Sequence, residues 1–222
     1  MNNDKYKQWA TYRRKILDNL LEKHKYLYKG TILDIGGRDR GRFIKPKQQV
    51  DKWIFADINN KYNPEIILDV SNMMQIGSNS IDVVNAIELF EHVKEIEKGL
   101  EECYRVLKEG GVLIISCPFL YHIHGDPYDY QRWTHHKWRI ELNKVGFNVE
   151  KLIIMGKYFT SLAEMVRFGL KAKRSKSRYY NLVIRLLYPI LEKLVFKDNG
   201  SFVRTDPVLN NWHSGYFIVA RK

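Results

Sequence analysis

The chain of 222 residues is 45% hydrophobic and 13% aromatic, which suits one well-packed domain and excludes a disordered chain. Its formal net charge of +12 favours anionic partners such as nucleic acid, anionic lipid or phosphorylated substrates, although a solvated lysine-rich surface gives the same charge. The two cysteines cannot form a disulfide framework, and the first residues lack the apolar core of a signal peptide. We therefore expect a cytoplasmic protein.

Predicted strands and helices alternate along the chain. Apolar residues spaced by three or four predict helices over 5–25, 95–107 (ended by Gly110-Gly111) and from a Thr134 cap to Gly146. Short apolar runs predict strands over 31–35, 53–57, 64–70, 81–84, 112–117, 147–155 and 215–220. Such alternation is typical of an α/β fold with a largely parallel sheet between two layers of helices.

About 57 residues separate the last two predicted strands. We expect a single domain over 1–222, with a helical extension at 1–30 and a helical, basic insertion at 157–213. The insertion contains two apolar helices joined by residues 171–178, which include five basic residues and no acidic one. A wide apolar stripe beside a charged connector fits a lid or a dimer contact. It also fits peripheral contact of residues 171–197 with an anionic membrane. The oligomeric state stays open.

Three predicted strands end in a carboxylate, and the first is followed by a glycine pair. These residues are Asp34 before Gly36-Gly37, then Asp57 and Asp69. Ligands of open α/β sheets bind beyond the carboxyl ends of the strands, and an acid about 20 residues after a glycine turn can bind a ribose. Asp57 follows Gly36 by 21 residues, and Asp69 could accept a hydrogen bond from an adenine amine. Acids at strand ends also cap helices, but the ordered set favours an adenosine-type ligand.

Two motifs resemble those of class I S-adenosylmethionine-dependent methyltransferases, in particular the type 11-like subgroup that acts on small molecules and accompanies glycan biosynthesis. Leu33-Asp34-Ile35-Gly36-Gly37 is similar to their first motif, and residues 81–93, which end in Glu-Leu-Phe-Glu-His-Val, are similar to their fourth-strand motif. The resemblance implies a Rossmann-like seven-stranded sheet in the order 3-2-1-4-5-7-6, with the last strand antiparallel and helices on both faces. It also implies S-adenosyl-L-methionine as the cofactor.

The same resemblance assigns the cofactor-binding residues. Gly36 and Gly37 would pass close to the methionine part, Asp57 would hold the ribose and Ile58 would pack on the adenine. The assignment further includes Asp34, Asp69, Val70, Asn85, Ala86 and Ile87. Arg38 stands where the family often has glycine, and it could pair with the cofactor carboxylate or an anionic substrate. His92 is expected to be a packing residue at a helix start.

Residues 118–134 are dense in histidines and aromatic residues, and they resemble a segment of the glycan-associated subgroup. A neutral histidine can take the proton of an attacking hydroxyl while an aspartate orients its ring. The candidate catalytic residues are His122, His124 and Asp126, with Asp129 as an alternative base. Asp129 and Arg132 could equally fix the loop, and methyl transfer can proceed through positioning alone. No cysteine pair or further acid cluster supports a metal, so no metal site is predicted.

The sequence therefore predicts a methyltransferase acting on a small or lipid-linked acceptor, with a saccharide hydroxyl as the leading candidate. A nicotinamide oxidoreductase would need Gly-x-Gly-x-x-Gly, which is absent. An RNA or other nucleic-acid methyltransferase is an alternative, but no separate RNA-binding module is visible and no specific nucleic acid is predicted. A non-catalytic cofactor-binding protein at a membrane surface is the other alternative. Either membrane reading implies a peripheral position at the inner membrane face.

Overall fold

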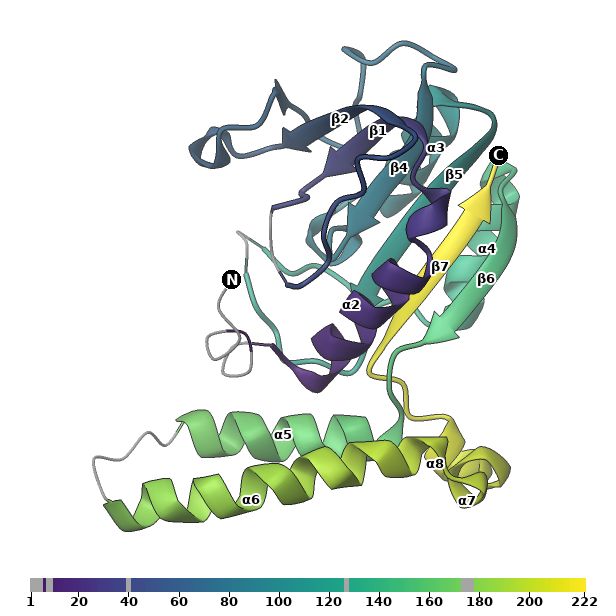
Figure 1. Cartoon of the computed structure of the whole chain (residues 1–222). Coiled ribbons are helices and arrows are strands. Elements are labelled where there is room, and N and C mark those ends of the chain that lie inside the picture. The colour runs from purple at the N-terminus through teal and green to yellow at the C-terminus, as the bar shows by residue number, and fades with distance from the viewer. Residues whose placement is uncertain (1–5, 7–9, 39–40, 126–127, 173–177) are drawn as a thin grey trace.

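A seven-stranded sheet forms the centre of the molecule (Figure 1). The computed structural model describes residues 6, 10–38, 41–125, 128–172 and 178–222. The strands are β1 (Gly30–Ile35), β2 (Val50–Asp57), β3 (Ile66–Ile67), β4 (Ile81–Ile87), β5 (Leu107–Pro118), β6 (Asn148–Ile154) and β7 (Gly215–Arg221). Their order is β3-β2-β1-β4-β5-β7-β6, and β7 is antiparallel to both neighbours. The predicted fold class is confirmed.

Helices cover both faces of this sheet, because successive apolar side chains along each strand point to opposite faces and form two separate cores. The α-helices are α2 (Tyr12–Lys23), α3 (Ile96–Val106), α4 (His135–Val145), α5 (Tyr158–Ala172), α6 (Arg178–Phe196), α7 (Ser201–Thr205) and α8 (Pro207–Asn210). Short 3-10 turns are η1 (Lys25–Leu27), η2 (Asn60–Tyr62), η3 (Phe90–His92) and η4 (Lys197–Asn199). Ile32 and Val83 pack with α2 on one face, whereas their neighbours Leu33 and Val84 pack with α3 and α4 on the other. Among the described residues, no helix could span a membrane.

Three predicted boundaries were wrong. The helix predicted over 5–25 is interrupted at Thr11, and α2 begins at Tyr12, because Thr11 is extended and its hydroxyl accepts the Arg14 N–H at 2.9 Å. Residues 5 and 7–9 lie outside the described residues. Strand β5 begins at Leu107 and runs through Gly110-Gly111, so these glycines lie inside a strand and do not end the helix. Leu107 pairs with Ile81 of β4, and this tertiary contact outweighs the local glycine signal. The third strand has two residues only.

Helices α5 and α6 lie side by side in a layer set apart from the sheet, between β6 and β7 in the chain (Figure 1). The buried Asp198 in η4, just after α6, caps the start of α5. Its carboxylate accepts the N–H groups of Lys157 (2.7 Å), Phe159 (2.8 Å) and Thr160 (3.0 Å), together with the Thr160 hydroxyl (2.6 Å). One side chain thus closes the two-helix unit and fixes where α5 begins.

We expect Asp198→Ala to lower the free energy of unfolding by about 2–4 kcal/mol, because several donors lose one charged acceptor. Asp206→Ala is the matched control, since Asp206 caps the short α8 through Val208 and Leu209 near the surface. That change should cost about 1 kcal/mol or less. Urea denaturation measures both values, and equal effects would remove the special role of Asp198.

Candidate functional site

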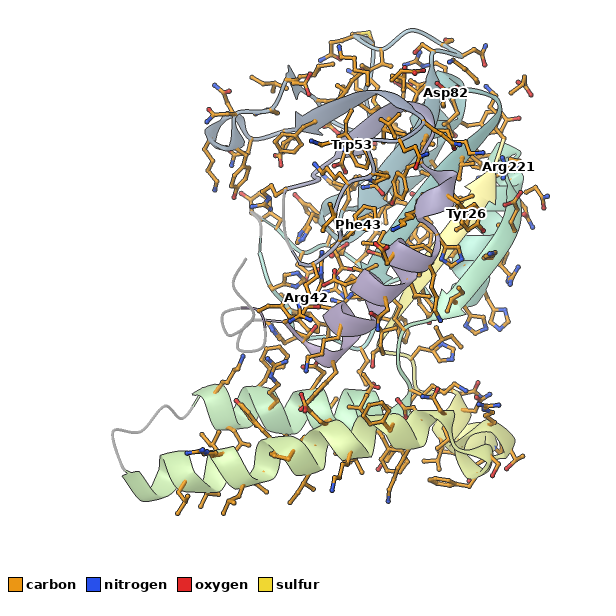
Figure 2. All side chains as sticks on the ribbon, in the orientation of Figure 1. Tyr26, Arg42, Phe43, Trp53, Asp82 and Arg221 are labelled. Carbon is orange, nitrogen blue, oxygen red and sulfur yellow. The ribbon has the colours of Figure 1, made fainter. Side chains whose placement is uncertain are left out.

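The buried Asp34 braces the carboxyl end of β1. Its carboxylate accepts from the Trp53 indole N–H at 2.8 Å and the Asn85 amide at 2.6 Å, and it lies 3.1 Å from the Lys45 ammonium. Burial raises the pKa of Asp34, whereas Lys45 and the two donors favour its charged form. Asn85 accepts from the Tyr28 hydroxyl at 2.8 Å, and the Tyr28 ring stacks on Trp53, labelled in Figure 2. This network holds β1, β2 and β4 in place at the strand ends.

The glycine pair after β1 forms a tight turn that residues with a side chain would not fit. Gly36 has a φ of +68°, and its N–H donates to the Ala56 carbonyl of β2 at 2.8 Å. A Cβ on Gly37 would lie 1.9 Å from the Asp34 carboxylate. Arg38 follows, and its guanidinium lies over the Tyr62 ring at 3.9 Å. The arginine that departs from the family pattern is thus held beside the turn by a cation–π contact.

A cavity of about 380 Å³ opens beyond the ends of β1, β2 and β4. It brings together six of the predicted cofactor residues, namely Gly36, Arg38, Asp57, Ile58, Asp69 and Val70. Residues not predicted for the cofactor also line it, among them Glu88, Leu89, His92, Tyr128 and Tyr130. The other predicted residues, Asp34, Gly37, Asn85, Ala86 and Ile87, are not among its lining. Ala86 is fully buried in the core instead.

The two remaining acids border the cavity in different ways. Asp57 is buried and its Oδ1 accepts the Asn59 N–H at 2.8 Å, so β2 turns sharply at this point. Asp69 is exposed and accepts the N–H and hydroxyl of Ser71 at 2.8 and 2.7 Å. Ile58 is 61% exposed, which leaves an apolar surface for a flat ring. An apolar face between two acids fits an adenosine group.

Glu88 follows β4 and forms an ion pair with Arg13 of α2. The two terminal guanidinium nitrogens of Arg13 each lie 2.7 Å from a carboxylate oxygen, and the Ser116 hydroxyl donates to the same carboxylate at 2.9 Å. Burial opposes the charge on Glu88, but Arg13 outweighs it and lowers the pKa of Glu88 to about 2. Glu88 has a left-handed φ of 55°, a conformation that this pairing stabilises. No local pattern relates Arg13 to a residue 75 positions away.

Glu91 in η3 is 2% exposed, and neither carboxylate oxygen has a hydrogen-bond partner among the described residues. Burial and the neighbouring Glu88 raise the pKa of Glu91 to about 8. The His92 Nε2 lies 3.8 Å from its Oε1. His92 also faces the cavity, although it was predicted to be a packing residue.

The loop after β5 carries the predicted catalytic residues. Asp129 forms a bidentate ion pair with Arg132, and it accepts the His124 N–H at 3.0 Å. Although burial opposes its charge, Arg132 lowers the pKa of Asp129 to about 2, so this carboxylate is a weak base. Its contacts fix the loop. Asp126 lies outside the described residues.

The two candidate histidines lie differently on this loop. His124 contacts the rings of His92 (5.1 Å between centroids), Tyr121 (5.2 Å) and His122 (5.8 Å). Burial, and then His92, lower the pKa of His124, so its ring is neutral near pH 7. His122 stacks on Tyr121 and contacts Phe168 of α5, with ring centroids 4.4 and 4.7 Å away. His124 therefore lies between His92, which lines the cofactor cavity, and His122, which contacts α5.

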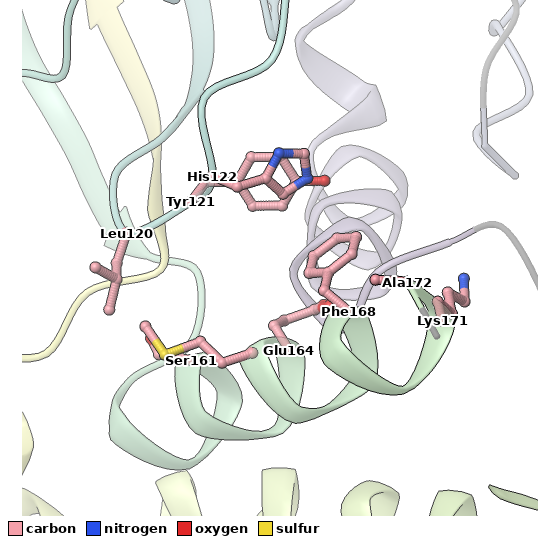
Figure 3. A pocket seen from close by; sticks show the side chains of 9 residues that line it. Leu120, Tyr121, His122, Ser161, Glu164, Phe168, Lys171 and Ala172 are labelled. Atoms are coloured by element: carbon pink, nitrogen blue, oxygen red, sulfur yellow. The ribbon is translucent and has the colours of Figure 1, made fainter. Parts of the chain in front are cut away.

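A second cavity, of about 810 Å³, lies between this loop and α5 (Figure 3). Its walls are mainly apolar and aromatic, and a few polar groups face it. The residues that line it are Leu120, Tyr121 and His122 of the loop and Ser161, Glu164, Met165, Phe168, Lys171 and Ala172 of α5. Because His92 lines the first cavity and His122 the second, and both contact the His124 ring, the three histidines lie between the two cavities.

Comparison with known proteins agrees with this fold. The family model described as "Methyltransferase domain" matches residues 50–115. The fold is similar to that of an S-adenosylmethionine-dependent methyltransferase from Archaeoglobus fulgidus, at 20% identity, with 94% of each chain covered and a TM-score of 0.59. Residues 50–115 therefore match a methyltransferase domain, and the chain has the fold of S-adenosylmethionine-dependent methyltransferases.

Other solved structures share this fold. One from Bacillus halodurans, described as a "putative methyltransferase", is 15% identical over 92% of this chain and 98% of its own, with a TM-score of 0.54. Phosphoethanolamine N-methyltransferase 2 of Haemonchus contortus, solved with S-adenosyl-L-methionine, is 16% identical with a TM-score of 0.53. The match covers 94% of this chain and 52% of that one. Among curated proteins, no significant sequence match is found.

We expect Asp57→Ala to weaken binding of S-adenosylhomocysteine by about 1–3 kcal/mol, because a ribose hydroxyl would lose its acceptor. Isothermal titration calorimetry measures the affinity. Asp51→Ala is the control, since Asp51 is an exposed acid on the same strand. Circular dichroism checks that both variants fold, and unchanged affinity in a folded Asp57→Ala protein would remove Asp57 from the ribose site.

Proposed function

We propose that the enzyme methylates an amphipathic acceptor, lipid-linked or carrying another apolar group, on an oxygen or nitrogen, with a saccharide hydroxyl as the leading candidate. The observation that carries this proposal is the apolar cavity beside α5, which lies next to the cofactor cavity with the contacting rings of His122, His124 and His92 between them. Leu120, Met165 and Phe168 suit the apolar part of such an acceptor. The exposed rings of Tyr128 and Tyr130 at the cofactor cavity offer faces on which a sugar could stack.

Bound S-adenosylmethionine supplies an electrophilic methyl group on a sulfonium. Asp57, Asp69 and Ile58 would hold its adenosine part, and the Gly36 turn leaves room beside Leu89. His122 is placed to accept the acceptor's proton. The Ile123 carbonyl lies 3.0 Å from its Nδ1, and because a carbonyl can only accept, the proton of the neutral ring sits on Nδ1. The Nε2 lone pair is then available as a general base.

The outer face of α6 supports contact with an anionic membrane, from which a lipid-linked acceptor could be drawn. Leu182, Leu186, Ile190 and Phe196 are exposed at helical spacing, with Leu186 at 62% and Ile190 at 59%. Arg185, Lys193 and Lys197 are exposed beside them. Leu191, by contrast, is buried against Ala163 of α5 and Tyr12 of α2. An apolar stripe flanked by cations is typical of a helix that lies in a membrane interface.

The acceptor class is tested with methyl-radiolabelled S-adenosylmethionine and separate lipid, aqueous and RNA fractions of cells that express the protein. We expect label in the lipid fraction. His122→Asn, which keeps a donor for the Ile123 carbonyl, should lower incorporation about 100-fold and leave S-adenosylhomocysteine affinity unchanged. The exposed His136→Asn is the control. Label in RNA alone would overturn the proposal, and full activity of His122→Asn would leave positioning as the mechanism.

Membrane contact is tested by flotation of the full chain with vesicles of phosphatidylglycerol or phosphatidylcholine. We expect binding to the anionic vesicles at low salt and weaker binding at high salt. Leu186→Gln with Ile190→Gln should abolish it, whereas Val208→Gln, an equally exposed apolar position on α8, should not. No flotation at low salt contradicts the proposal. A dimer that the double variant converts to a monomer would instead identify α6 as a dimer contact.

A further inference from the structure

Three side chains that could bind a metal meet between the two cavities. One carboxylate oxygen of Glu91 and one ring nitrogen each of His92 and His124 lie within 4.8 Å of one another. Nitrogen and oxygen ligands of a zinc-like cation lie about 2.0–2.2 Å from it and therefore, in tetrahedral geometry, about 3.3–3.6 Å apart. Small side-chain movements would close the described arrangement around one ion. The sequence suggested no such site because Glu91 and His124 lie on different loops.

The two arginines near Glu91 are each paired with another carboxylate. Arg13 is paired with Glu88, and Arg132 is paired with Asp129. Glu91 is nevertheless almost completely buried, and its two oxygens lack hydrogen-bond partners among the described residues. An unpartnered carboxylate in this position is costly, and a divalent cation would satisfy it.

Both histidines are oriented as metal ligands usually are. The Nδ1 of His92 lies 2.6 Å from the Tyr128 carbonyl, and the Nδ1 of His124 lies 3.2 Å from an Asp129 oxygen. These acceptors favour the proton on Nδ1 and leave Nε2 as the coordinating atom of each ring. A second group that fixes the tautomer in this way is typical of histidine metal sites. Arg132, through its ion pair with Asp129, then fixes the carboxylate that orients the His124 ring.

We propose that Glu91, His92 and His124 bind one divalent transition-metal ion such as Zn²⁺, with a further coordination position open to the acceptor. For its chemistry the inference rests on the proposed function. The ion would bind the acceptor hydroxyl oxygen and lower its pKa. Its proton passes to His122 and then to solvent. The oxygen attacks the methyl carbon, an O–C bond forms, the C–S bond breaks, and its electron pair stays on sulfur as a neutral thioether.

The binding experiment uses the untagged full chain after treatment with a chelator, and it needs no acceptor. We expect Zn²⁺ to bind with a stoichiometry of one by calorimetry, and Co²⁺ to give a visible absorption band that Zn²⁺ removes. His92→Asn and His124→Asn keep a donor at the Nδ1 position while removing the ligand nitrogen. Each of these, and Glu91→Gln, should weaken the affinity by 100-fold or more. Asp129→Asn should weaken it by about 10–100-fold.

The exposed His136→Asn is the matched control and should bind the metal as the unmodified protein does. Thermal melting and S-adenosylhomocysteine affinity verify that each variant folds. Absence of binding, or binding that survives Glu91→Gln and His92→Asn unchanged, overturns the proposal. Failure of the acceptor assay would leave these metal measurements unaffected. Full methyl transfer by the chelator-treated enzyme would overturn the catalytic part while sparing the proposed function.

Discussion

The ion pair between Arg13 and Glu88 is the interaction on which the geometry of the site depends. It ties the first turn of α2 to the residue that follows β4, where the backbone takes a left-handed conformation. At the same end of α2, Glu164 of α5 accepts the main-chain N–H groups of Tyr12 and Arg13. Arg13 also lies over the Tyr121 ring at 5.2 Å. Helix α5 and the two loops at the cavities are therefore connected to the first turn of α2.

This connection matters because the region is dense in buried acids. Without Arg13, Glu88 and Glu91 would be neighbouring carboxylates with little water to solvate them. Burial of a bidentate pair is tolerated here because Ser116 supplies a further hydrogen bond. The same consideration explains why Asp34, although it is fully buried, can sit at the end of β1 with three polar partners.

The fold could be read from the sequence because its signals are local and repeated. Short apolar runs indicated the strands, and α4 is bounded by Thr134 and Gly146 as predicted, with Gly146 in the left-handed conformation. The approximate position of the cofactor cavity also followed, since Gly36, Asp57 and Asp69 lie at adjacent strand ends. Some predicted element boundaries were wrong because tertiary contacts decide them. At Leu107, for example, pairing with β4 outweighed the helix-ending signal of the following glycines.

The site was less predictable because its contacts join distant parts of the chain. Arg13 looked like one more cation of a basic helix, and nothing near it in sequence indicated Glu88. Asp34 and Asn85 bind each other across β1 and β4, so their polar groups are engaged within the sheet. The environment of Glu91 includes Glu88, Arg13 of α2 and Arg132 of the loop after β5, and only the packing of these segments shows that its carboxylate is enclosed.

The position of β7 has a consequence for how the molecule is made. This strand lies between β5 and β6, yet it follows both of them, and the α5–α6 unit, in the chain. During synthesis β5 and β6 must wait with unpaired edges until β7 emerges, and open edges of apolar strands favour aggregation. The late pairing spans about 100 residues of sequence from β5, a long-range contact of the kind that slows folding. We therefore expect completion of the sheet, rather than formation of its parallel part, to be the slow step of folding.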